Sequence, residues 1–285
     1  MTNIIDGKAR AKEIKELLKA EVNQLTSRNI VPGLAVVLVG SDPASNVYVK
    51  SKKKTCKALG IESFSYELPE NTPEQDLVAL IDKLNKDKKV HGILVQLPLP
   101  RHINENEVLA KIDPKKDVDG FHPVNLGKLI RGESCLKSCT PAGIIDLLES
   151  TGETLAGKKA VIIGRSNIVG KPVSIMLLEK NTTVTICHSK TKNLEKEVSE
   201  ADIVVAAIGK PNFVKGSWIK KNAIVLDVGI NRMDDGTLAG DVEFEEAKKN
   251  ALWITPVPGG IGPMTIAMLM KNTVEATKKQ TKDQV

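Results

Sequence analysis

The hydrophobic positions of this chain fall into short unbroken runs, separated by longer stretches with helical spacing. Unbroken apolar runs of about four to eight residues are typical of buried strands. The run at residues 34–39 shows no polar alternation, so we expect a central strand that is covered on both faces. Residues 63–68 alternate weakly and allow a further strand. The other runs that predict strands lie at residues 92–97, 160–163, 183–187, 203–208, 224–228 and 253–255.

Between these runs, apolar residues recur every third or fourth position, which predicts helices. Thr72 precedes Pro73, a residue that suits the first turn of a helix, so we expect Thr72 to be an N-cap. The polar tail, residues 278–285, is expected to fray. The predicted helices span residues 8–28, 44–59, 73–85, 106–111, 141–150 and 173–180, and a final helix ends near residue 277.

The alternation of strands and helices predicts parallel sheets with right-handed crossovers. We therefore predict an α/β protein with two α/β domains, the second of them Rossmann-like. Ligands of open α/β sheets bind outside the carboxyl ends of the strands. Polar and Pro-rich segments at residues 40–43, 96–100 and 256–263 follow predicted strands, and we expect them to line a cleft between the domains.

The segment from Ala160 to Pro172 combines a buried strand, a turn and the start of a helix. This arrangement presents backbone N–H groups to a phosphate. Gly164 and Gly170 are the only glycines of the loop, and Ser166 stands where the middle glycine is usual, so the segment departs from the G-x-G-x-x-G pattern. On this pattern alone, an ordinary strand-to-helix turn explains the segment equally well.

The end of the next predicted strand distinguishes NADP from NAD. An NAD-binding protein places Asp or Glu there, on the ribose hydroxyls. No acidic residue occurs between residues 182 and 192. Arg165 from the first loop, Ser189 and Lys190 would instead attract the 2′-phosphate of NADP. The local chemistry therefore favours NADP.

Tyr48 and Lys52 lie one helical turn apart on a predicted helix, so their side chains share a face. Lys50, Lys53 and Lys54 crowd the same segment, and this crowding favours a neutral amine at Lys52 that could act as a base. The alternative is a solvated, lysine-rich helix face, and the pattern alone favours that alternative.

Polar residues also mark other strand ends and loops. Gln96 interrupts an apolar strand near its end, where a polar side chain needs either a structural partner or a ligand, and the two are equally supported. Asp117 and Asp119 lie in a loop that also contains Gly120. Turn chemistry explains such aspartates in most proteins, but a carboxylate facing a cleft could instead bind a pair of ligand N–H groups.

Three glycines and three prolines fall within residues 256–263. Gly259, Gly260 and Gly262 permit the backbone to approach a flat ligand closely. An elaborate turn with Pro263 at a helix start is the structural alternative. A simple turn needs fewer glycines and prolines, so the number found here favours the ligand-binding interpretation over the structural turn.

The composition narrows the class of protein. With 285 residues, of which 41% are hydrophobic, the chain can form a sizeable core. The net charge is +6, but the lysines are dispersed and aromatic residues make up only 3%, so we expect no nucleic-acid partner. No apolar run approaches the length of a membrane span. The four cysteines and four histidines lack the spacing of a metal site, so we expect no metal. Cysteines without a paired pattern also indicate a reducing, cytoplasmic setting.

Five segments together resemble the bifunctional methylenetetrahydrofolate dehydrogenase/cyclohydrolase (FolD) family. The resemblance extends over nearly the whole chain, and its last segment is close to diagnostic. The segments are Tyr48–Lys52, Gly92–Pro100, Lys116–Pro123, Gly164–Pro172 and Pro256–Thr265.

The resemblance implies NADP-dependent oxidation of methylenetetrahydrofolate to methenyltetrahydrofolate, followed by hydrolysis to formyltetrahydrofolate. It implies a cytoplasmic homodimer and a final helix that returns to the first domain. Residues 1–138 with 264–285 would then form the folate-binding catalytic domain, and residues 139–263 the NADP-binding domain. From the loop alone, a dehydrogenase of another small substrate or a catalytically silent NADP-binding protein would fit as well, and only the family motifs argue against both.

The resemblance also implies roles for individual residues. Lys52 resembles the catalytic lysine, with Tyr48 and Gln96 in support, and Asp119 resembles the residue that holds the pterin ring. The substrate contacts implied in this way are Tyr48, Lys52, Gln96, Asp119, Pro258, Gly259 and Gly260. The cofactor contacts are Gly164, Arg165, Ser166, Ser189 and Ile230.

Overall fold

The computed structural model describes residues 2–282, and the chain divides into two compact units. Unit 1 comprises residues 1–12 and 140–265, and unit 2 comprises residues 13–139 and 266–285. The helices α1 (Gly7–Thr26) and α10 (Ile261–Gln280) each contribute to both units. The division lies close to the boundaries predicted at residues 138 and 264, but residues 1–12, which the prediction placed with residues 13–138, group instead with residues 140–265. The assignment of functions to the two parts stays a prediction.

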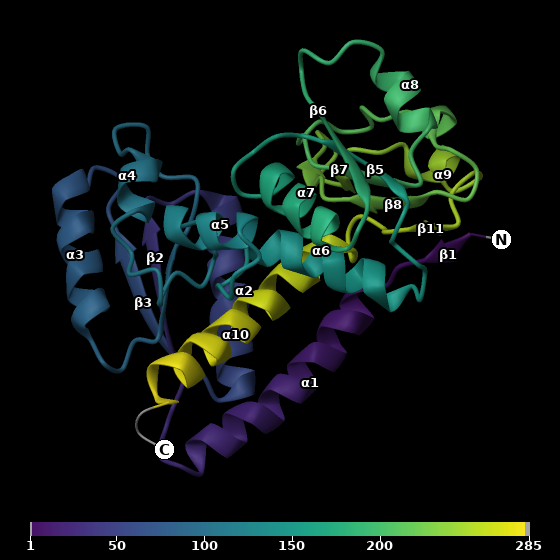
Figure 1. The fold of residues 1–285 in the computed structure, drawn as a ribbon. Coiled ribbons are helices and arrows are strands. Elements are labelled where there is room, and N and C mark those ends of the chain that lie inside the picture. Colours follow the sequence, from purple (N-terminus) through teal and green to yellow (C-terminus); the bar gives the residue numbers. More distant parts are fainter. Residues whose placement is uncertain (1, 283–285) are drawn as a thin grey trace. The chain divides into compact units, whose positions relative to one another are not determined.

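Unit 1 contains a six-stranded parallel sheet in the order β1-β11-β8-β7-β5-β6 (Figure 1). Strand β1, which the sequence did not predict, pairs with β11. A short antiparallel pair lies outside this sheet, formed by β9 (Asn231–Arg232) and β10 (Leu238–Ala239). The strands of the parallel sheet are β1 (Asn3–Ile4), β5 (Lys159–Ile163), β6 (Thr183–Cys187), β7 (Ile203–Ala206), β8 (Ile224–Asp227) and β11 (Trp253–Ile254).

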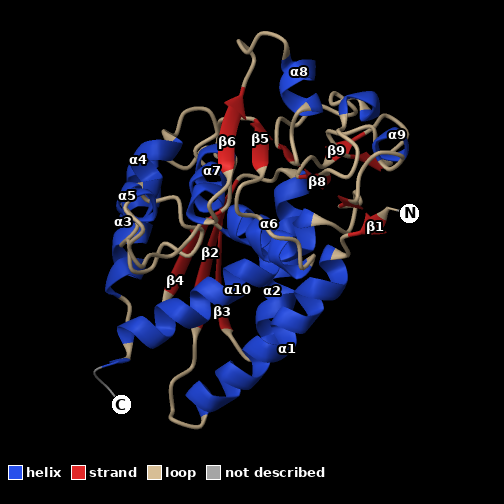
Figure 2. Cartoon of the chain, turned by 45° about the vertical axis from the view of Figure 1, so that its right-hand side comes forward, coloured by secondary structure: helices blue, strands red, loops and turns tan. Residues whose placement is uncertain are grey.

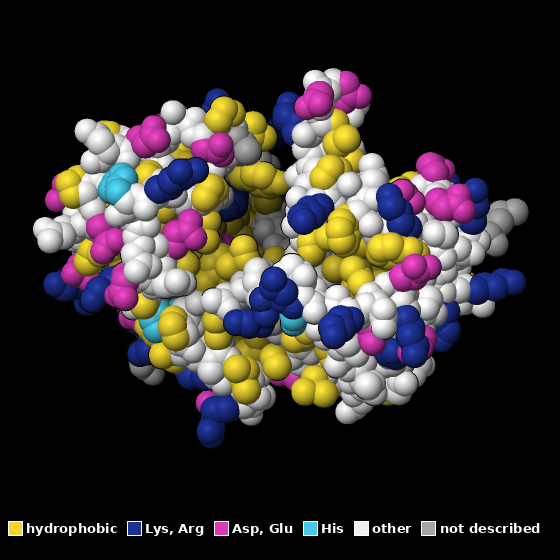
Figure 3. Space-filling view, turned by 90° about the horizontal axis from the view of Figure 1, so that it is seen from above, with side chains coloured by type: hydrophobic (Ala, Val, Ile, Leu, Met, Phe, Trp, Pro, Cys, Tyr) yellow, Lys and Arg dark blue, Asp and Glu magenta, His cyan; other side chains and the backbone are white. Residues whose placement is uncertain are grey.

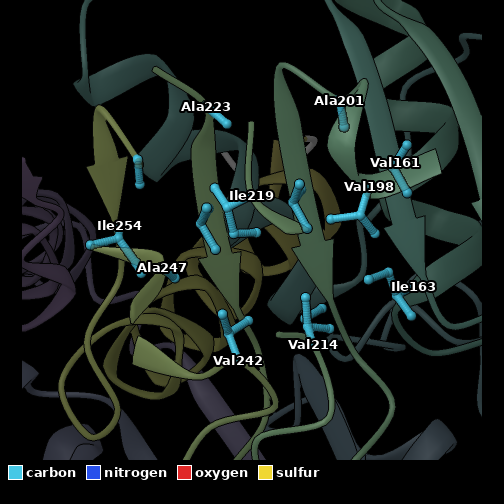
Figure 4. Close-up of a cluster of buried hydrophobic side chains, with 14 of the residues drawn as sticks. Val161, Ile163, Val198, Ala201, Val214, Ile219, Ala223, Val242, Ala247 and Ile254 are labelled. Carbon is cyan, nitrogen blue, oxygen red and sulfur yellow. The ribbon is translucent and has the colours of Figure 1, made fainter. Parts of the chain in front are cut away.

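Helices cover the sheet of unit 1. Val161 and Ile163 of β5 point to one face and pack in a buried cluster with Val198 of α8 (Leu194–Ser199) and Ala247 of α9 (Phe244–Ala247), as Figure 4 shows. A single 3₁₀ turn, Gly216–Trp218, leads into Ile219 of the same cluster. Ala160 and Ile162 are buried on the opposite face, because side chains alternate along a strand. The remaining helices of this region are α6 (Cys139–Ser150) and α7 (Gly170–Glu179).

Unit 2 is organised around a three-stranded parallel sheet in the order β3-β2-β4 (Figure 2). Every residue of β2 (Gly33–Val39) is buried, which confirms the prediction of a central strand covered on both faces. Helix α2 (Pro43–Leu59) connects β2 to β3 (Glu62–Leu68), and α3 (Glu74–Lys86) connects β3 to β4 (Gly92–Val95).

Local signals in the sequence explain the bounds of α2. The Asp42 side chain accepts a hydrogen bond from the Ser45 backbone N–H at 2.7 Å, which satisfies one of the unpaired donors at the start of the helix. Pro43 occupies the first turn, where its missing N–H costs nothing. Gly60 ends the helix in the left-handed conformation with φ of 79°.

One prediction about the helices was wrong, and one helix was missed. Thr72 does not cap α3, because the helix begins at Glu74 and the Thr72 hydroxyl donates to the Pro69 carbonyl oxygen at 2.7 Å. The sequence also gave no sign of α5 (Pro123–Ile130), which follows α4 (Glu105–Leu109). This helix has only eight residues, too few for a clear periodicity, and His122 Nδ1 caps it by accepting from the Val124 backbone N–H at 3.1 Å.

The ends of two other elements also differ from the prediction. Strand β4 ends at Val95, two residues early, because the chain turns toward Pro98. Helix α10 continues to Gln280, and Thr281 is buried with its hydroxyl bonded to the Thr277 carbonyl oxygen at 2.8 Å. The predicted fraying is therefore wrong for residues 278–281, and residues 283–285 lie outside the described part of the chain.

Candidate active site

Helix α2 carries Tyr48 and Lys52 on one face. Lys52 is buried, with 8% of its surface exposed, whereas Lys50, Lys53 and Lys54 are exposed. The buried positions of the helix recur every three or four residues, as expected for the side that packs on the sheet. A solvated helix face therefore describes Lys53 and Lys54 but is wrong for Lys52.

The buried amine of Lys52 has a defined partner. Lys52 Nζ donates a hydrogen bond to Gln96 Oε1 at 2.9 Å. Gln96 follows β4, its backbone N–H donates to the Val37 carbonyl oxygen at 2.8 Å, and its Nε2 donates to the Leu97 carbonyl oxygen at 2.7 Å. These contacts hold the amide so that its oxygen faces the lysine.

The loop that carries Asp119 runs beside β4. The Ile93 backbone N–H donates to the Lys116 carbonyl oxygen at 2.7 Å. Asp117 is buried and accepts hydrogen bonds from the backbone N–H groups of Phe121 at 3.2 Å and His122 at 2.8 Å, and from Asn125 Nδ2 at 2.8 Å. Turn chemistry thus accounts for Asp117.

Asp119 differs from Asp117 because no residue among residues 2–282 donates a hydrogen bond to its carboxylate. Burial raises the pKa of Asp119 to about 6, the Lys52 ammonium opposes this shift, and the charge of Asp117 adds to it. The side chain nevertheless keeps part of its surface exposed. Burial also raises the pKa of Tyr48, which keeps its hydroxyl neutral. A partly exposed acceptor therefore lies near a lysine that is already bonded elsewhere.

Sequence reasoning missed Asn272, which fastens the Asp119 loop. Asn272 lies on α10, is 7% exposed, and donates from Nδ2 to the carbonyl oxygens of Val118 and Lys137, each at 2.8 Å. Cys139 Sγ donates to the same Val118 oxygen at 3.2 Å. The one available signal was a polar residue on an otherwise apolar helix face, the same kind of signal that marked Gln96.

The dinucleotide loop of unit 1 lies at the point where the strand order reverses. The chain passes from β6, on one side of β5, to β7 on the other side. Gly164 follows β5 with φ of 130°, and a Cβ atom added there would lie 2.3 Å from the Ala207 carbonyl oxygen, just after β7. Only glycine permits this approach. Open α/β sheets bind nucleotides at such a reversal.

The loop after Gly164 has unused hydrogen-bond donors. Ser166 Oγ accepts from the backbone N–H groups of Val169 at 3.1 Å and Gly170 at 3.3 Å, at the start of α7. Arg165 and Ser166 are exposed, and their own backbone N–H groups donate to no acceptor in the described chain. Such donors before a helix N-terminus suit a phosphate.

The other predicted cofactor contacts are also exposed. Ser189 lies in the turn after β6, where the His188 backbone N–H donates to Thr191 Oγ1 at 2.8 Å. Ile230, after β8, is 44% exposed, which is unusual for a large apolar side chain without a ligand or partner.

Two buried aspartates, neither predicted, hold the loops of this sheet edge. Asp227 accepts from the backbone N–H groups of Gly229 at 2.9 Å, Asp241 at 2.8 Å and Val242 at 2.8 Å. Asp241 accepts in turn from the backbone N–H groups of residues 208–210. Burial raises the pKa of Asp227 to about 6. Together these carboxylates fix the loops after β7 and β8.

The residues Pro258, Gly259 and Gly260 lie in unit 1, whereas Tyr48, Lys52, Gln96 and Asp119 lie in unit 2. The turn packs on the start of α1: the Lys8 backbone N–H donates to the Gly259 carbonyl oxygen at 2.9 Å. Gly259 has φ of 110°, and a Cβ atom added to Gly260 would lie 2.7 Å from the Pro256 carbonyl oxygen. Close backbone packing therefore gives this turn a structural reason for its glycines, and their contact with substrate stays a prediction.

Within residues 2–282, no helix has the length and apolar character that crossing a membrane requires. The same residues contain no group of three or more His, Cys, Asp or Glu side chains placed to hold a metal ion.

A glycine-rich loop at the reversal of a parallel sheet defines a dinucleotide-binding α/β protein. The chain belongs to the tetrahydrofolate dehydrogenase/cyclohydrolase family, since the model of the family's catalytic domain matches residues 5–119 and that of its NAD(P)-binding domain matches residues 138–281.

Individual relatives agree with this assignment. The bifunctional protein FolD of Acetivibrio thermocellus is 59% identical over 98% of both chains. The crystal structure of the FolD dehydrogenase/cyclohydrolase from Campylobacter jejuni is 51% identical, with a TM-score of 0.97 over 98% of this chain and 99% of that one. The Trypanosoma brucei FolD structure, complexed with NADP cofactor and inhibitor, is 41% identical, with a TM-score of 0.95 over 99% of each chain.

Proposed function

We propose that this protein oxidises methylenetetrahydrofolate with NADP⁺ and hydrolyses the resulting methenyltetrahydrofolate to formyltetrahydrofolate. The observation that carries the proposal is the buried Lys52–Gln96 hydrogen bond, beside the partly exposed Asp119, within the part of the chain that matches the family's catalytic domain. Family membership argues against a dehydrogenase of an unrelated small acid and against a silent NADP-binding protein.

Asp119 holds the substrate by its pterin ring. Its carboxylate has no donor among residues 2–282 and keeps part of its surface exposed. An ionised carboxylate accepts two ligand N–H groups in one plane, and each such bond contributes about 1.5–3 kcal/mol to binding. Asp117, which is buried and bonded three times, keeps the loop in place but does not bind substrate.

Lys52 serves the hydrolytic step. The Lys52 amine donates to Gln96 Oε1, and in its neutral form it retains a lone pair that can accept a proton from the attacking water. The methenyl group is cationic, so a second positive charge beside it is disfavoured. Tyr48, one helical turn earlier, presents a neutral hydroxyl that donates to the substrate or to that water.

The residues of unit 1 fit NADP. The unpaired backbone N–H groups of Arg165 and Ser166 suit the pyrophosphate, and Gly164 leaves the space that a side chain would fill. Arg165 and Ser189 are exposed and can bind the 2′-phosphate, and the exposed Ile230 offers an apolar surface to a ring. NADP⁺, when bound, is the hydride acceptor, and the chain's part in that step is alignment.

We also propose a cytoplasmic homodimer. The outer edge of β3 pairs with no strand of the described chain, and the Ser65 hydroxyl is buried there without a partner. An unpaired edge favours pairing with a second chain. None of the four cysteines forms a disulfide and all four are buried, which supports a reducing compartment. Light scattering should give the mass of two chains, and fractionation should recover the protein with cytoplasmic markers; a monomer, or recovery elsewhere, contradicts these proposals.

The prediction that no nucleic acid binds rests on the distribution of charge. On the face shown in Figure 3, Lys and Arg side chains lie among Asp and Glu side chains and form no single basic stripe. Electrostatic binding to a nucleic-acid backbone needs many cations aligned on one surface.

The test of the main proposal is incubation with methylenetetrahydrofolate and NADP⁺, with NADPH formation and the decay of methenyl absorbance followed together. Both signals should depend on enzyme concentration. NADPH formation without enzyme-dependent decay of the methenyl absorbance would contradict the proposed hydrolase activity. The absence of both signals would contradict both activities and favour a protein that only binds NADP.

A further inference from the structure

Unit 2 contains a cavity of about 620 Å³ that none of the proposed catalytic residues lines. His91, which immediately precedes β4, lies in its wall, whereas Gln96 follows the other end of β4. Parallel strands place all their amino ends at one edge of a sheet and their carboxyl ends at the other. The cavity therefore lies at the edge of the sheet opposite to the Lys52–Gln96 pair.

The wall of this cavity is strongly basic. The described lining residues include six lysines and a single acidic residue, Asp87. The lining therefore carries a formal excess of five positive charges. No aromatic Phe, Tyr or Trp lines it. We call it the basic cavity, and its lysines are Lys86, Lys88, Lys115, Lys116, Lys128 and Lys279.

Most of these cations lack a carboxylate partner. Lys279 pairs with Glu275 at 2.6 Å and also donates to Ser134 Oγ at 3.3 Å. Elsewhere, exposed lysines such as Lys215 and Lys220 pair with acids at 2.6 Å. By contrast, four lysines of the cavity form no ion pair within residues 2–282, namely Lys86, Lys88, Lys115 and Lys128.

Lys116 is a buried lysine in the wall of the basic cavity. It is 6% exposed, and its Nζ donates to the carbonyl oxygens of Leu84 at 3.1 Å and Asp87 at 2.8 Å. Burial and, to a smaller extent, the charge of Lys116 lower the pKa of His91 against the opposing charge of Asp87, which disfavours a second buried positive charge there. Burial lowers the pKa of Lys116, and the charges of Asp113 and Asp87 oppose this shift. A bound anion would offset the free energy that a buried cation costs.

Helix ends account for only part of this charge. The C-terminal ends of α3, α5 and α10 all contribute to the wall, and lysines in a last turn interact favourably with the helix dipole. Each helix end carries about half a negative charge, so three ends offset roughly 1.5 of the five excess positive charges. A net excess of about 3.5 positive charges remains for a ligand.

We propose that the basic cavity binds a small polyanion that carries a chain of phosphate groups, such as inorganic tripolyphosphate or a nucleoside triphosphate. Lysine ammonium groups bind phosphate oxygens as point charges, and several separated lysines match several phosphates better than one. The volume lies within the range of about 300–1,000 Å³ that is usual for small-ligand sites. Because no Phe, Tyr or Trp is present to stack on a base, the phosphate chain carries the recognition. This proposal does not depend on the proposed activity.

Calorimetric titration of the full chain tests it, with NADP⁺ present at saturation so that the nucleotide loop is occupied. Tripolyphosphate and magnesium-free ATP should bind one per chain with affinities within about threefold of each other, since lysines contact only phosphate. Orthophosphate should bind at least about tenfold more weakly, because it engages fewer charge-assisted bonds. ATP binding far tighter than tripolyphosphate would show base recognition and overturn the proposal, as would no binding of tripolyphosphate.

Two double variants separate a local site from general charge. Lys115→Gln with Lys128→Gln should weaken tripolyphosphate binding by at least about tenfold. Lys19→Gln with Lys57→Gln removes the same charge from exposed positions of unit 2 outside the cavity and should change the affinity by less than about threefold. An equal loss of tripolyphosphate affinity in the two double variants would show that binding depends on net charge alone, and it would contradict a specific site in the basic cavity. Thermal unfolding of each variant, run in parallel, should remain near the parent, because these four side chains form no ion pair among residues 2–282.

Discussion

Lys52 Nζ and Gln96 Oε1 lie 2.9 Å apart and join residues 44 positions apart in the sequence, one on a helix and the other at a strand end. The Gln96 amide cannot turn over without losing its bond from Nε2 to the Leu97 carbonyl oxygen at 2.7 Å. The oxygen therefore stays directed at the amine. This contact makes Lys52 the only lysine of α2 that is buried, and it is the basis for assigning the hydrolytic step to that residue.

Arg165→Ala should reduce the preference for NADP over NAD. The exposed Arg165 has no carboxylate partner among residues 2–282, and a charge-assisted bond to the 2′-phosphate contributes about 1.5–3 kcal/mol, or at least about tenfold in affinity. The measurement is the ratio of kcat/KM for the two cofactors.

Lys221→Ala is the matched control for Arg165. Lys221 is exposed and precedes β8, so it lies at the amino-end edge of the parallel sheet, away from the loop after β5. It should leave the ratio unchanged. A parent protein that uses NAD and NADP equally would show that the interpretation of the loop is mistaken.

Gly170→Ala should destabilise unit 1 and weaken NADP binding. The new Cβ atom would lie 2.2 Å from the Gly164 carbonyl oxygen, so the loop backbone must move, and overpacking of this kind costs about 1–3 kcal/mol. Gly127→Ala is the control with the opposite sign: nothing lies within 4 Å of its added Cβ atom inside α5, and it should stabilise by about 0.5–1 kcal/mol. Thermal unfolding measures both, and a neutral Gly170→Ala would refute the tight loop.

Folate binding should improve as the pH rises through the pKa of Asp119. Burial raises that pKa to about 6, so the carboxyl is neutral at lower pH and can accept two N–H groups only above it. KM for methylenetetrahydrofolate should therefore fall between about pH 5 and 7, about one unit on each side of the pKa. Asp119→Asn should raise KM and flatten this dependence, while NADP affinity stays near the parent value.

The same shift has a consequence for stability. An unfolded Asp titrates near about 3.9, so between about pH 4 and 6 the folded protein holds more protons than the unfolded chain, and its free energy of unfolding falls as the pH rises. Asp227, whose pKa is also raised to about 6, contributes with the same sign. Asp119→Asn should remove only part of this decline, and an unchanged profile would show that Asp119 does not titrate in this range.

The sequence was most informative where one residue type has one local consequence. Apolar runs predicted every strand of the two parallel sheets except β1 and β3, and Asp42, Pro43 and Gly60 mark the ends of α2. The two short antiparallel strands and α5 were not predictable, because elements of two to eight residues have no measurable periodicity.

The residues of the candidate site were likewise predictable only where a local pattern in the sequence marked them. Gln96 stood out because a polar residue ends an apolar strand, but nothing local distinguished Lys52 from Lys53, since only packing against the sheet buries one and exposes the other. Asn272 and Asp241 act through contacts more than 30 residues away or across loops, and such partners exist only in the folded chain.

The most direct test of the account is the cyclohydrolase rate of Lys52→Met compared with Lys53→Met. Both variants keep the bulk and remove one amine from the same helix, but Lys52 is buried on Gln96 and Lys53 is exposed. Lys52→Met should lose at least about 10²-fold in hydrolysis of methenyltetrahydrofolate, the usual contribution of a general base, while binding NADP normally. Lys53→Met should hydrolyse at the parent rate. If Lys52→Met also hydrolyses at near the parent rate, the proposed role of Lys52 is contradicted.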